Sequence, residues 1–187
     1  MAADLFLSKG FAATSVGEIA AQAKASKSSF YSRFPTKEKL FTEVFRRSTD
    51  AAFHEFSTLL LPDSEPREVL RSLGAFLVRC VLSPDSIDLL RLVYMESKHI
   101  PELGRIYYAL GPERGRAHTS EYFEKLKARG FFRSDMDTSL GAEQFHDLLT
   151  GEIVRRCALS IEPPFTAEEQ ARRLNAAVDV FIRAYRA

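Results

Sequence analysis

The sequence predicts an all-α protein, in which a small N-terminal helix-turn-helix module of three helices is joined by a long helix to a larger helical body. Apolar residues recur at helical spacing along nearly the whole chain, and no segment of useful length alternates apolar with polar residues. Four prolines each precede a helix-compatible run, where a residue without an N–H group fits the first turn: Pro66, Pro84, Pro101 and Pro112. The chain has 187 residues, which is long enough to bury a real core.

The first two helices are short. We expect one that ends at Gly10 and a second from about Val16 to Ala23. Ser15 and Glu18 form a capping-box pattern at the start of the second helix. Its apolar residues make one stripe: Val16, Ile19, Ala20 and Ala23.

The third helix is expected to start after Ser26 and to end before Pro35, and Thr36 can cap a long fourth helix. The inner face of the fourth helix carries Phe41, Phe45, Ala52, Phe56 and Leu59. The segment LPDSEP, residues 61–66, ends this helix and marks the break between module and body. We divide the chain into a helix-turn-helix module at 1–47 and a body at 48–187.

The clearest helices of the body are the last two, at about Thr138 to Ser160 and Ala167 to Tyr185. The final helix opens with a second capping-box pattern, Thr166 and Glu169. One stripe of this helix is apolar: Leu174, Ala177, Val178, Phe181, Ile182 and Tyr185. Such a stripe fits a core-facing helix and an intersubunit helix equally well, so both interpretations stay open.

Charge is distributed unevenly along the chain. The net charge is +1, but residues 1–47 carry eight Lys and Arg against four Asp and Glu, which leaves −3 for the rest. A basic end on a mildly acidic body is typical of a protein that meets an anion with that end. Cys80 and Cys157 lie in apolar helical patterns and are expected to be buried thiols. No signal peptide and no apolar run of ~20 residues is visible, so we expect a soluble, cytoplasmic protein without a membrane partner.

The stretch SKSSFYSRFP, residues 26–35, explains the basic end. Two short helices joined by a tight turn form a helix-turn-helix, whose second helix enters the DNA major groove with its N-terminal residues on base edges. Short polar side chains and a lysine suit that first turn, while Phe30 and Phe34 turn inward. The residues predicted to contact DNA are Ser15, Ser26, Lys27, Ser28, Ser29, Tyr31, Ser32, Arg33, Thr36 and Lys37. Among them, Tyr31 and Lys37 are expected to bind phosphate, as are backbone N–H groups near Ser15 and Thr36.

The run GFAATSVGEIAAQAKASKSSFYSRFPTKEKLF, residues 10–41, resembles the DNA-binding signature of TetR-type transcriptional regulators. The body resembles the AefR-like C-terminal subtype through RLVYMESKHIPELGRIYYALGP and GAEQFHDLLTGEIVRR. Lys24 and Ser28 depart from this pattern, because the family usually has glycine at both positions. A left-handed Lys24 would cost ~1 kcal/mol or more. The first helix is also about a turn short and lacks the basic arm that often precedes it.

The resemblance implies a homodimeric repressor that binds a palindromic operator and is released by a small-molecule effector. Aromatic residues of the body suggest an apolar or aromatic effector. Candidate pocket residues are Phe76, Tyr94, Met95, His99, Tyr107, Tyr108, Tyr122 and Phe145, although aromatic residues at helical spacing often only pack. Candidate dimer contacts are Leu148, Leu149, Ile153, Phe181, Ile182 and Tyr185.

Two alternatives differ in class from a ligand-responsive repressor. One is a DNA-binding protein of the same fold without an effector, an architectural or division factor. The other is an enzyme, which the sequence does not favour. The four histidines, His54, His99, His118 and His146, have no metal-ligand spacing, and no nucleophile or phosphate-loop motif is present. We therefore expect no catalytic residues, no metal and no cofactor.

Overall fold

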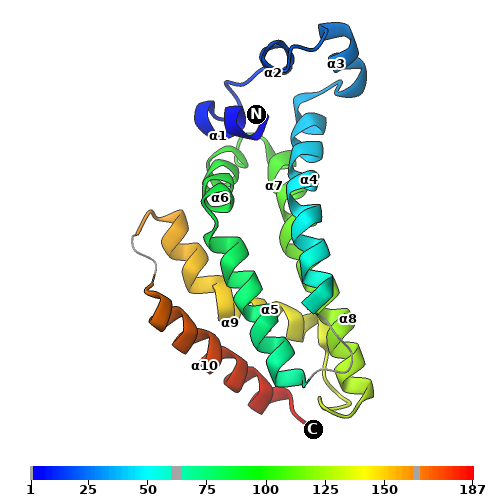
Figure 1. The fold of residues 1–187 in the computed structure, drawn as a ribbon, viewed down its shortest axis with the longest axis vertical. Coiled ribbons are helices and arrows are strands. Elements are labelled where there is room, and N and C mark those ends of the chain that lie inside the picture. Colours follow the sequence, from blue (N-terminus) through cyan, green and yellow to red (C-terminus); the bar gives the residue numbers. More distant parts are fainter. Residues whose placement is uncertain (1, 60–64, 162–164) are drawn as a thin grey trace. The chain divides into compact units, whose positions relative to one another are not determined.

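The computed structural model describes residues 2–59, 65–161 and 165–187, which fall into two compact units. The first unit comprises Met1–Ala51 and Asp88–Pro112, and the second comprises Ala52–Ile87 and Glu113–Ala187. Among the described residues all long elements are helices, and the only β pairing is an isolated bridge between Phe132 and Arg186 (Figure 1). The all-α prediction is confirmed. The break expected at 61–66 lies largely outside the described residues, and the functional division at residue 47 stays a prediction.

The first unit contains α1 (Ala2–Lys9), α2 (Val16–Gln22), α3 (Lys27–Arg33), the first part of α4 (Lys37–Leu59), most of α6 (Pro84–Glu96) and α7 (Pro101–Tyr108). Its core centres on three phenylalanines, Phe6, Phe11 and Phe41, whose ring centroids lie 5.3 to 5.7 Å apart. Leucines and valines of α1, α4, α6 and α7 surround these rings. This aromatic centre fixes α1 and the start of α4 against each other.

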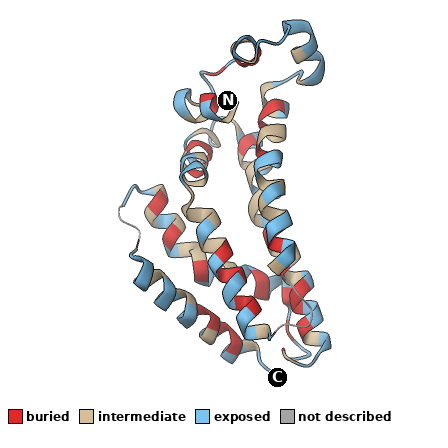
Figure 2. Ribbon diagram, viewed as in Figure 1, coloured by how far each residue is buried: buried red, intermediate tan, exposed pale blue. Residues whose placement is uncertain are grey.

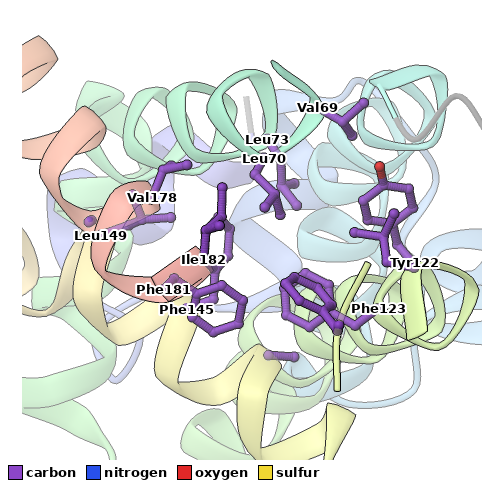
Figure 3. Close-up of a cluster of buried hydrophobic side chains, with 14 of the residues drawn as sticks. Val69, Leu70, Leu73, Tyr122, Phe123, Phe145, Leu149, Val178, Phe181 and Ile182 are labelled. Atoms are coloured by element: carbon purple, nitrogen blue, oxygen red, sulfur yellow. The ribbon is translucent and has the colours of Figure 1, made fainter. Parts of the chain in front are cut away.

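The second unit contains α5 (Pro66–Leu82), α8 (Arg114–Ala128), α9 (Thr138–Ala158) and α10 (Ala167–Tyr185). Helices α5, α9 and α10 pack on one another, and α8 packs on α9. Phe123, Phe145 and Phe181 lie at the centre, with ring centroids 5.0 to 5.8 Å apart (Figure 3). The Leu174 side chain of α10 packs directly over Gly74 of α5, where a Cβ would lie only 2.5 Å from Leu174 Cδ1.

Side-chain caps begin the helices where the sequence predicts them. Four hydroxyls accept the backbone N–H three residues on, at 3.1 or 3.2 Å: those of Ser15, Ser26, Thr36 and Thr166. The two predicted capping boxes form only on the hydroxyl side. The carboxylate of Glu18 pairs with Lys9, and that of Glu169 pairs with Arg173 at 3.2 Å.

Three of the four prolines lie as predicted, in the first turn of α5, α6 and α7. Pro112 does not, because it lies inside a π-helical turn, Ala109–Glu113, that joins α7 to α8. A proline has no N–H to donate, and a wider turn in a longer helix accommodates that missing hydrogen bond.

Candidate nucleic-acid interface

The turn between α2 and α3 is held by the ending of α2. The N–H of Ala25 donates to the carbonyl of Ala20 at 3.0 Å, and Lys24 before it has φ +51°. These are the features of a Schellman ending, in which glycine is usual because it has no Cβ. The departure from glycine noted in the sequence therefore falls on a left-handed residue, with a backbone cost of about 1 kcal/mol.

Two phenylalanines of helix α3 join it to the core of its unit. Phe30 and Phe34 pack against the aromatic core of the first unit, with their ring centroids 5.2 Å apart. No residue of α3 is fully buried (Figure 2). Its exposed residues are Lys27, Ser28, Ser29, Tyr31, Ser32 and Arg33, all of them predicted DNA contacts.

The serines at the start of α3 differ in what remains available to a ligand. The Ser26 hydroxyl accepts from the N–H of Ser29 at 3.2 Å and donates to the Ser29 hydroxyl at 2.8 Å. Ser26 is therefore committed to the cap, whereas Ser29 keeps its own proton to donate. Ser28 is more loosely engaged, with its Oγ 3.4 Å from that of Ser26.

Side chains of α3 reach the start of α2. A Cβ at Gly17 would lie 3.5 Å from the Tyr31 hydroxyl oxygen and 3.8 Å from Lys27 Cε. The phenol and the lysine are thus gathered beside Ser15, the exposed cap of α2. A hydroxyl and an ammonium at this place offer two donors to one phosphate group. The sequence pattern did not single out Gly17, since nothing local indicates which residue faces Tyr31.

Lys37 has a more specific environment than the sequence suggests. Its Nζ donates to the carbonyls of Phe11 at 2.7 Å and Ala12 at 2.9 Å, and lies 4.6 Å from the centroid of the Phe11 ring. A phosphate would have to share the ammonium with these two carbonyls, because an ammonium has three N–H groups.

The positive charge available to an anion lies on and around α3. Within the described part of the chain, Lys24, Lys27 and Arg33 are exposed and have no ion-pair partner. Further along, Arg46 and Arg47 both pair with Glu43 at 2.7 Å, and the hydrogen bond from Arg46 lowers the pKa of that carboxyl.

Five of the predicted pocket residues belong to the first unit. Tyr94, Met95 and Tyr108 are each more than half exposed, and His99 is also exposed. Tyr107 is different, because its ring stacks on that of Phe45 with centroids 5.4 Å apart. Burial raises the pKa of Tyr107 to about 12.

The other three lie in the core of the second unit. Phe76 and Phe145 are buried members of that core. The Tyr122 ring is buried too, and its hydroxyl has no hydrogen-bond partner among the described residues. Burial raises the pKa of Tyr122.

A part-buried polar pair between α8 and α9 was not predicted. His146 Nε2 lies 2.9 Å from the Thr119 hydroxyl, which donates to the carbonyl of Gly115 at 3.0 Å. Burial, with a smaller contribution from Arg116, lowers the pKa of His146 to about 4, so the ring is neutral near pH 7. Thr119 and His146 are 27 residues apart in the chain, so no local pattern in the sequence relates them.

The prediction of dimer contacts needs correction. Leu149, Ile153, Phe181 and Ile182 are buried in the core of their own protomer, so a partner could not reach them without opening that core. The apolar stripe of α10 is a core-facing stripe. Leu148 is exposed, and Tyr185 is half-buried with its hydroxyl bonded to Gln144.

Two hollows of the second unit are lined by residues other than the predicted pocket residues. A small, partly open hollow of about 40 Å³ lies among α5, α9 and α10, with Leu149, Ile153 and Leu174 in its wall. It has room for water but not for a drug-sized ligand. An open groove of about 470 Å³ runs between α5 and α10 beside Val78, Leu82 and Ala171.

Two further properties concern the described residues as a whole. No helix among them has the length and apolar character needed to cross a membrane. Nor does this part of the chain bring three or more His, Cys, Asp or Glu side chains together in a way that could hold a metal ion. Cys157 is buried and Cys80 is half-buried, and neither forms a disulfide.

Comparison with known proteins agrees with the helix-turn-helix geometry. Residues 1–44 match the family model for bacterial regulatory proteins of the tetR family. Residues 68–187 match the model for the C-terminal domain of AefR-like transcriptional repressors. A curated relative, the uncharacterized HTH-type transcriptional regulator YuxN of Bacillus subtilis (strain 168), is 37% identical over 67 residues. That match covers 36% of this chain and 23% of YuxN, so it spans less than a quarter of the relative.

Solved structures match over the whole chain. A TetR-family regulator from Mesorhizobium loti MAFF303099 is 28% identical with a TM-score of 0.87, over 100% of this chain and 93% of that one. The flavonoid-responsive regulator FrrA is also 28% identical, with a TM-score of 0.81 over 99% and 93% of the two chains. The chain belongs to the TetR family of DNA-binding transcriptional regulators, with a C-terminal domain of the AefR-like repressor type.

Proposed function

We propose that the protein is a repressor that binds a palindromic operator as a homodimer and leaves it when a small aromatic molecule binds. The exposed face of α3 is the observation that supports DNA binding most strongly. Six consecutive or near-consecutive polar positions face solvent on a helix held by two phenylalanines, and no ion pair among the described residues neutralises Lys27 or Arg33. Such a helix can enter a major groove without losing its own packing.

The proposed DNA contacts are of two kinds, those to base edges and those to the phosphate backbone. Lys27 and Ser28, on the first turn of α3, would read base edges, with Ser29 beside them. Tyr31 beside Gly17 would bind phosphate, together with the exposed Ser32 and Arg33. Ser15, Ser26 and Thr36 hold helix starts and would contribute mainly through the backbone.

A dimer would use the outward faces of α9 and α10, because the inward faces of both helices are buried in the core of the protomer. Leu140 and Leu148 lie on α9 with about half of each side chain exposed, and Val180 on α10 is similarly exposed. Exposed Ala176 and Ala184 flank Val180 at intervals of four residues, which permits close helix packing. Two linked reading heads would bind two half-sites and add their binding free energies.

The proposed effector is aromatic. FrrA is described as responsive to flavonoids, and this chain resembles FrrA over nearly its whole length. Tyr122 offers a buried hydroxyl without a partner among the described residues, and such a group can bond a phenolic ligand. The chemistry proposed is therefore a flat aromatic body with hydroxyl groups.

Selection from a pool of random duplexes with purified protein tests the DNA function. The expected result is an inverted repeat whose half-sites are about one helical turn apart or a multiple of it. Failure to enrich any sequence would refute operator binding. A single unrepeated site would refute the dimer but not DNA binding.

The packed core of the second unit supports a second candidate function, a DNA-binding protein without an effector. Phe76 and Phe145 are buried in that core, and neither hollow is lined by a predicted pocket residue. Titration of the selected duplex complex with a panel of flavonoids separates the two. Release by a flavonoid that is lost in Tyr122→Phe favours the responsive repressor, while no release by any compound favours the second candidate.

A further inference from the structure

The connection between α1 and α2, residues 10–15, is held by charged side chains from two other helices. Lys37, at the start of α4, donates to the carbonyls of Phe11 and Ala12 at 2.7 and 2.9 Å. Glu96, the last residue of α6, accepts the N–H of Ala12 through Oε1 at 3.3 Å. All of these residues belong to the first unit.

The two charges act on the same peptide group. The carbonyl of Phe11 and the N–H of Ala12 belong to one peptide, so the ammonium binds its oxygen while the carboxylate binds its hydrogen. Each bond strengthens the other, because both polarise the peptide in the same direction. We call this arrangement of Lys37, Glu96 and the Phe11–Ala12 peptide the loop clamp.

The backbone around the clamp leaves little freedom. Gly10 has φ +86°, a conformation that favours glycine, and a Cβ there would lie 3.5 Å from Glu96 Oε1. The buried Thr14 hydroxyl lies 2.8 Å from the carbonyl of Gly10, to which it donates. On the other side, the carbonyl of Glu96 accepts the N–H of Ile100 at 2.8 Å, so the end of α6 is itself fixed.

Loss of the hydrogen bond from Ala12 to Glu96 should cost less folding stability than loss of a buried hydrogen bond. Ala12 is exposed, so water can satisfy its N–H if Glu96 is removed. The bond instead fixes the direction in which the chain enters Ser15 and α2. Tyr31 and Lys27 lie against Gly17 of α2. A bond that fixes α2 therefore also fixes the surface against which these two side chains, the proposed phosphate ligands, lie.

We propose that the loop clamp positions α2 and α3 for DNA, so that Lys37 and Glu96 are positioning residues for operator binding. This inference rests on the proposed DNA-binding function. It assigns a favourable role to a carboxylate in a DNA-binding unit, where electrostatics alone gives the opposite sign. A carboxylate near a phosphate backbone repels it, so removing one should strengthen binding unless its hydrogen bond holds the reading unit in place.

The first test uses the free protein and does not depend on DNA. Backbone ¹⁵N order parameters of residues 11–17 should fall in Glu96→Ala and be restored in Glu96→Gln, whose amide oxygen can still accept the Ala12 N–H. Glu102→Ala, an exposed carboxylate of α7, is the matched control and should leave the loop unchanged. Unchanged order parameters in Glu96→Ala would show that no clamp exists and would overturn the proposal.

The second test measures affinity for a duplex selected with wild-type protein. Glu96→Ala should bind about tenfold more weakly, the change expected for one lost charge-assisted hydrogen bond, with the same preferred sequence and an unchanged melting temperature. Glu96→Gln should recover most of the affinity. Lys37→Met should also weaken binding, and the double variant should lose less than the two single losses combined, because both residues hold one peptide.

The outcomes distinguish failure of the loop clamp from failure of the proposed DNA-binding function. If wild-type protein selects a duplex that Glu96→Ala binds equally well or more tightly, the positioning role is wrong and the DNA-binding function stands. If wild-type protein selects no duplex, the proposed function fails and this inference fails with it.

Discussion

Gly17 of α2 and Tyr31 of α3 face each other so closely that a Cβ at Gly17 would lie 3.5 Å from the Tyr31 hydroxyl oxygen. That distance is an ordinary van der Waals contact, so one methyl group fits and a larger side chain does not. The space above Gly17 is therefore what allows the phenol to lie over the start of α2.

Gly17→Ala and Gly17→Leu should have different effects. The alanine variant should keep DNA affinity and gain up to about 1 kcal/mol of stability, because alanine favours the helix over glycine. The leucine variant should displace Tyr31 and weaken binding to every duplex. Equal affinities of Gly17→Leu and wild type would show that Tyr31 need not lie at this place.

Base reading and phosphate binding can be separated along α3. Lys27→Ala or Ser28→Ala should change the preferred base at a defined operator position, with each lost contact worth ~1–3 kcal/mol. Tyr31→Phe should weaken binding to all sequences alike, because a phosphate carries no sequence information. Selection with each variant gives the measurement, and Lys125→Ala on α8 is the control. If Lys27→Ala and Ser28→Ala retain both affinity and base preference, α3 is only a capped surface helix.

Lys24 should be a site at which glycine stabilises the protein. Its φ of +51° is unfavourable for a residue with a Cβ, so Lys24→Gly should raise the free energy of unfolding by about 0.5–1 kcal/mol. Ser160 at the end of α9 has φ +56°, and Ser160→Gly should give a similar gain in the other unit. Gly130, with φ +72°, is the reverse case, since Gly130→Ala should lower stability by about 1 kcal/mol. Chemical denaturation measures all three, and a loss of stability in Lys24→Gly would contradict the strain.

Local patterns in the sequence predicted much of the helix-turn-helix part of the first unit. The caps at Ser15, Ser26 and Thr36 depend on residues three positions apart, and the inward Phe30 and Phe34 depend on one helical turn. Contacts over three or four residues can be predicted from the sequence, because helix geometry places residues at this spacing on the same face.

Contacts between distant segments could not be predicted in the same way. Glu96 meets Ala12 across 84 residues and Lys37 meets Phe11 across 26, so no local periodicity relates them. The apolar stripe of α10 was correctly found, but spacing does not say whether an apolar face meets its own core or a second protomer. Only the structure places Phe181 and Ile182 in the core of their own protomer.

The corrected interface gives a paired prediction. Leu148→Glu or Val180→Glu places a charge on an exposed face, so each monomer should stay folded while the dimer is lost and operator binding falls. Phe181→Glu should instead unfold the protomer, because it buries an unpaired charge in the core. Sedimentation and thermal melts distinguish these results. Tyr94→Glu, a similarly exposed site in the first unit, should remain dimeric, and a dimeric Leu148→Glu would exclude this face of α9.

The largely buried His146 should make stability depend on pH in a defined window. Its pKa lies near 4 in the folded protein, against an ordinary value of 6.5, because burial disfavours the charged ring. The unfolded chain therefore takes up a proton as the pH falls below 6.5, while the folded protein does not until about pH 4. The stability that the neutral ring contributes is complete above pH 6.5. It is lost between pH 6.5 and 4, by about 3 kcal/mol in total.

In His146→Gln, the free energy of unfolding should fall less steeply with decreasing pH over this interval than in wild type. The difference in slope should correspond to the uptake of about one proton on unfolding. Denaturant titrations at several pH values measure these slopes, and identical slopes for His146→Gln and wild type would mean that the ring titrates normally in the folded protein.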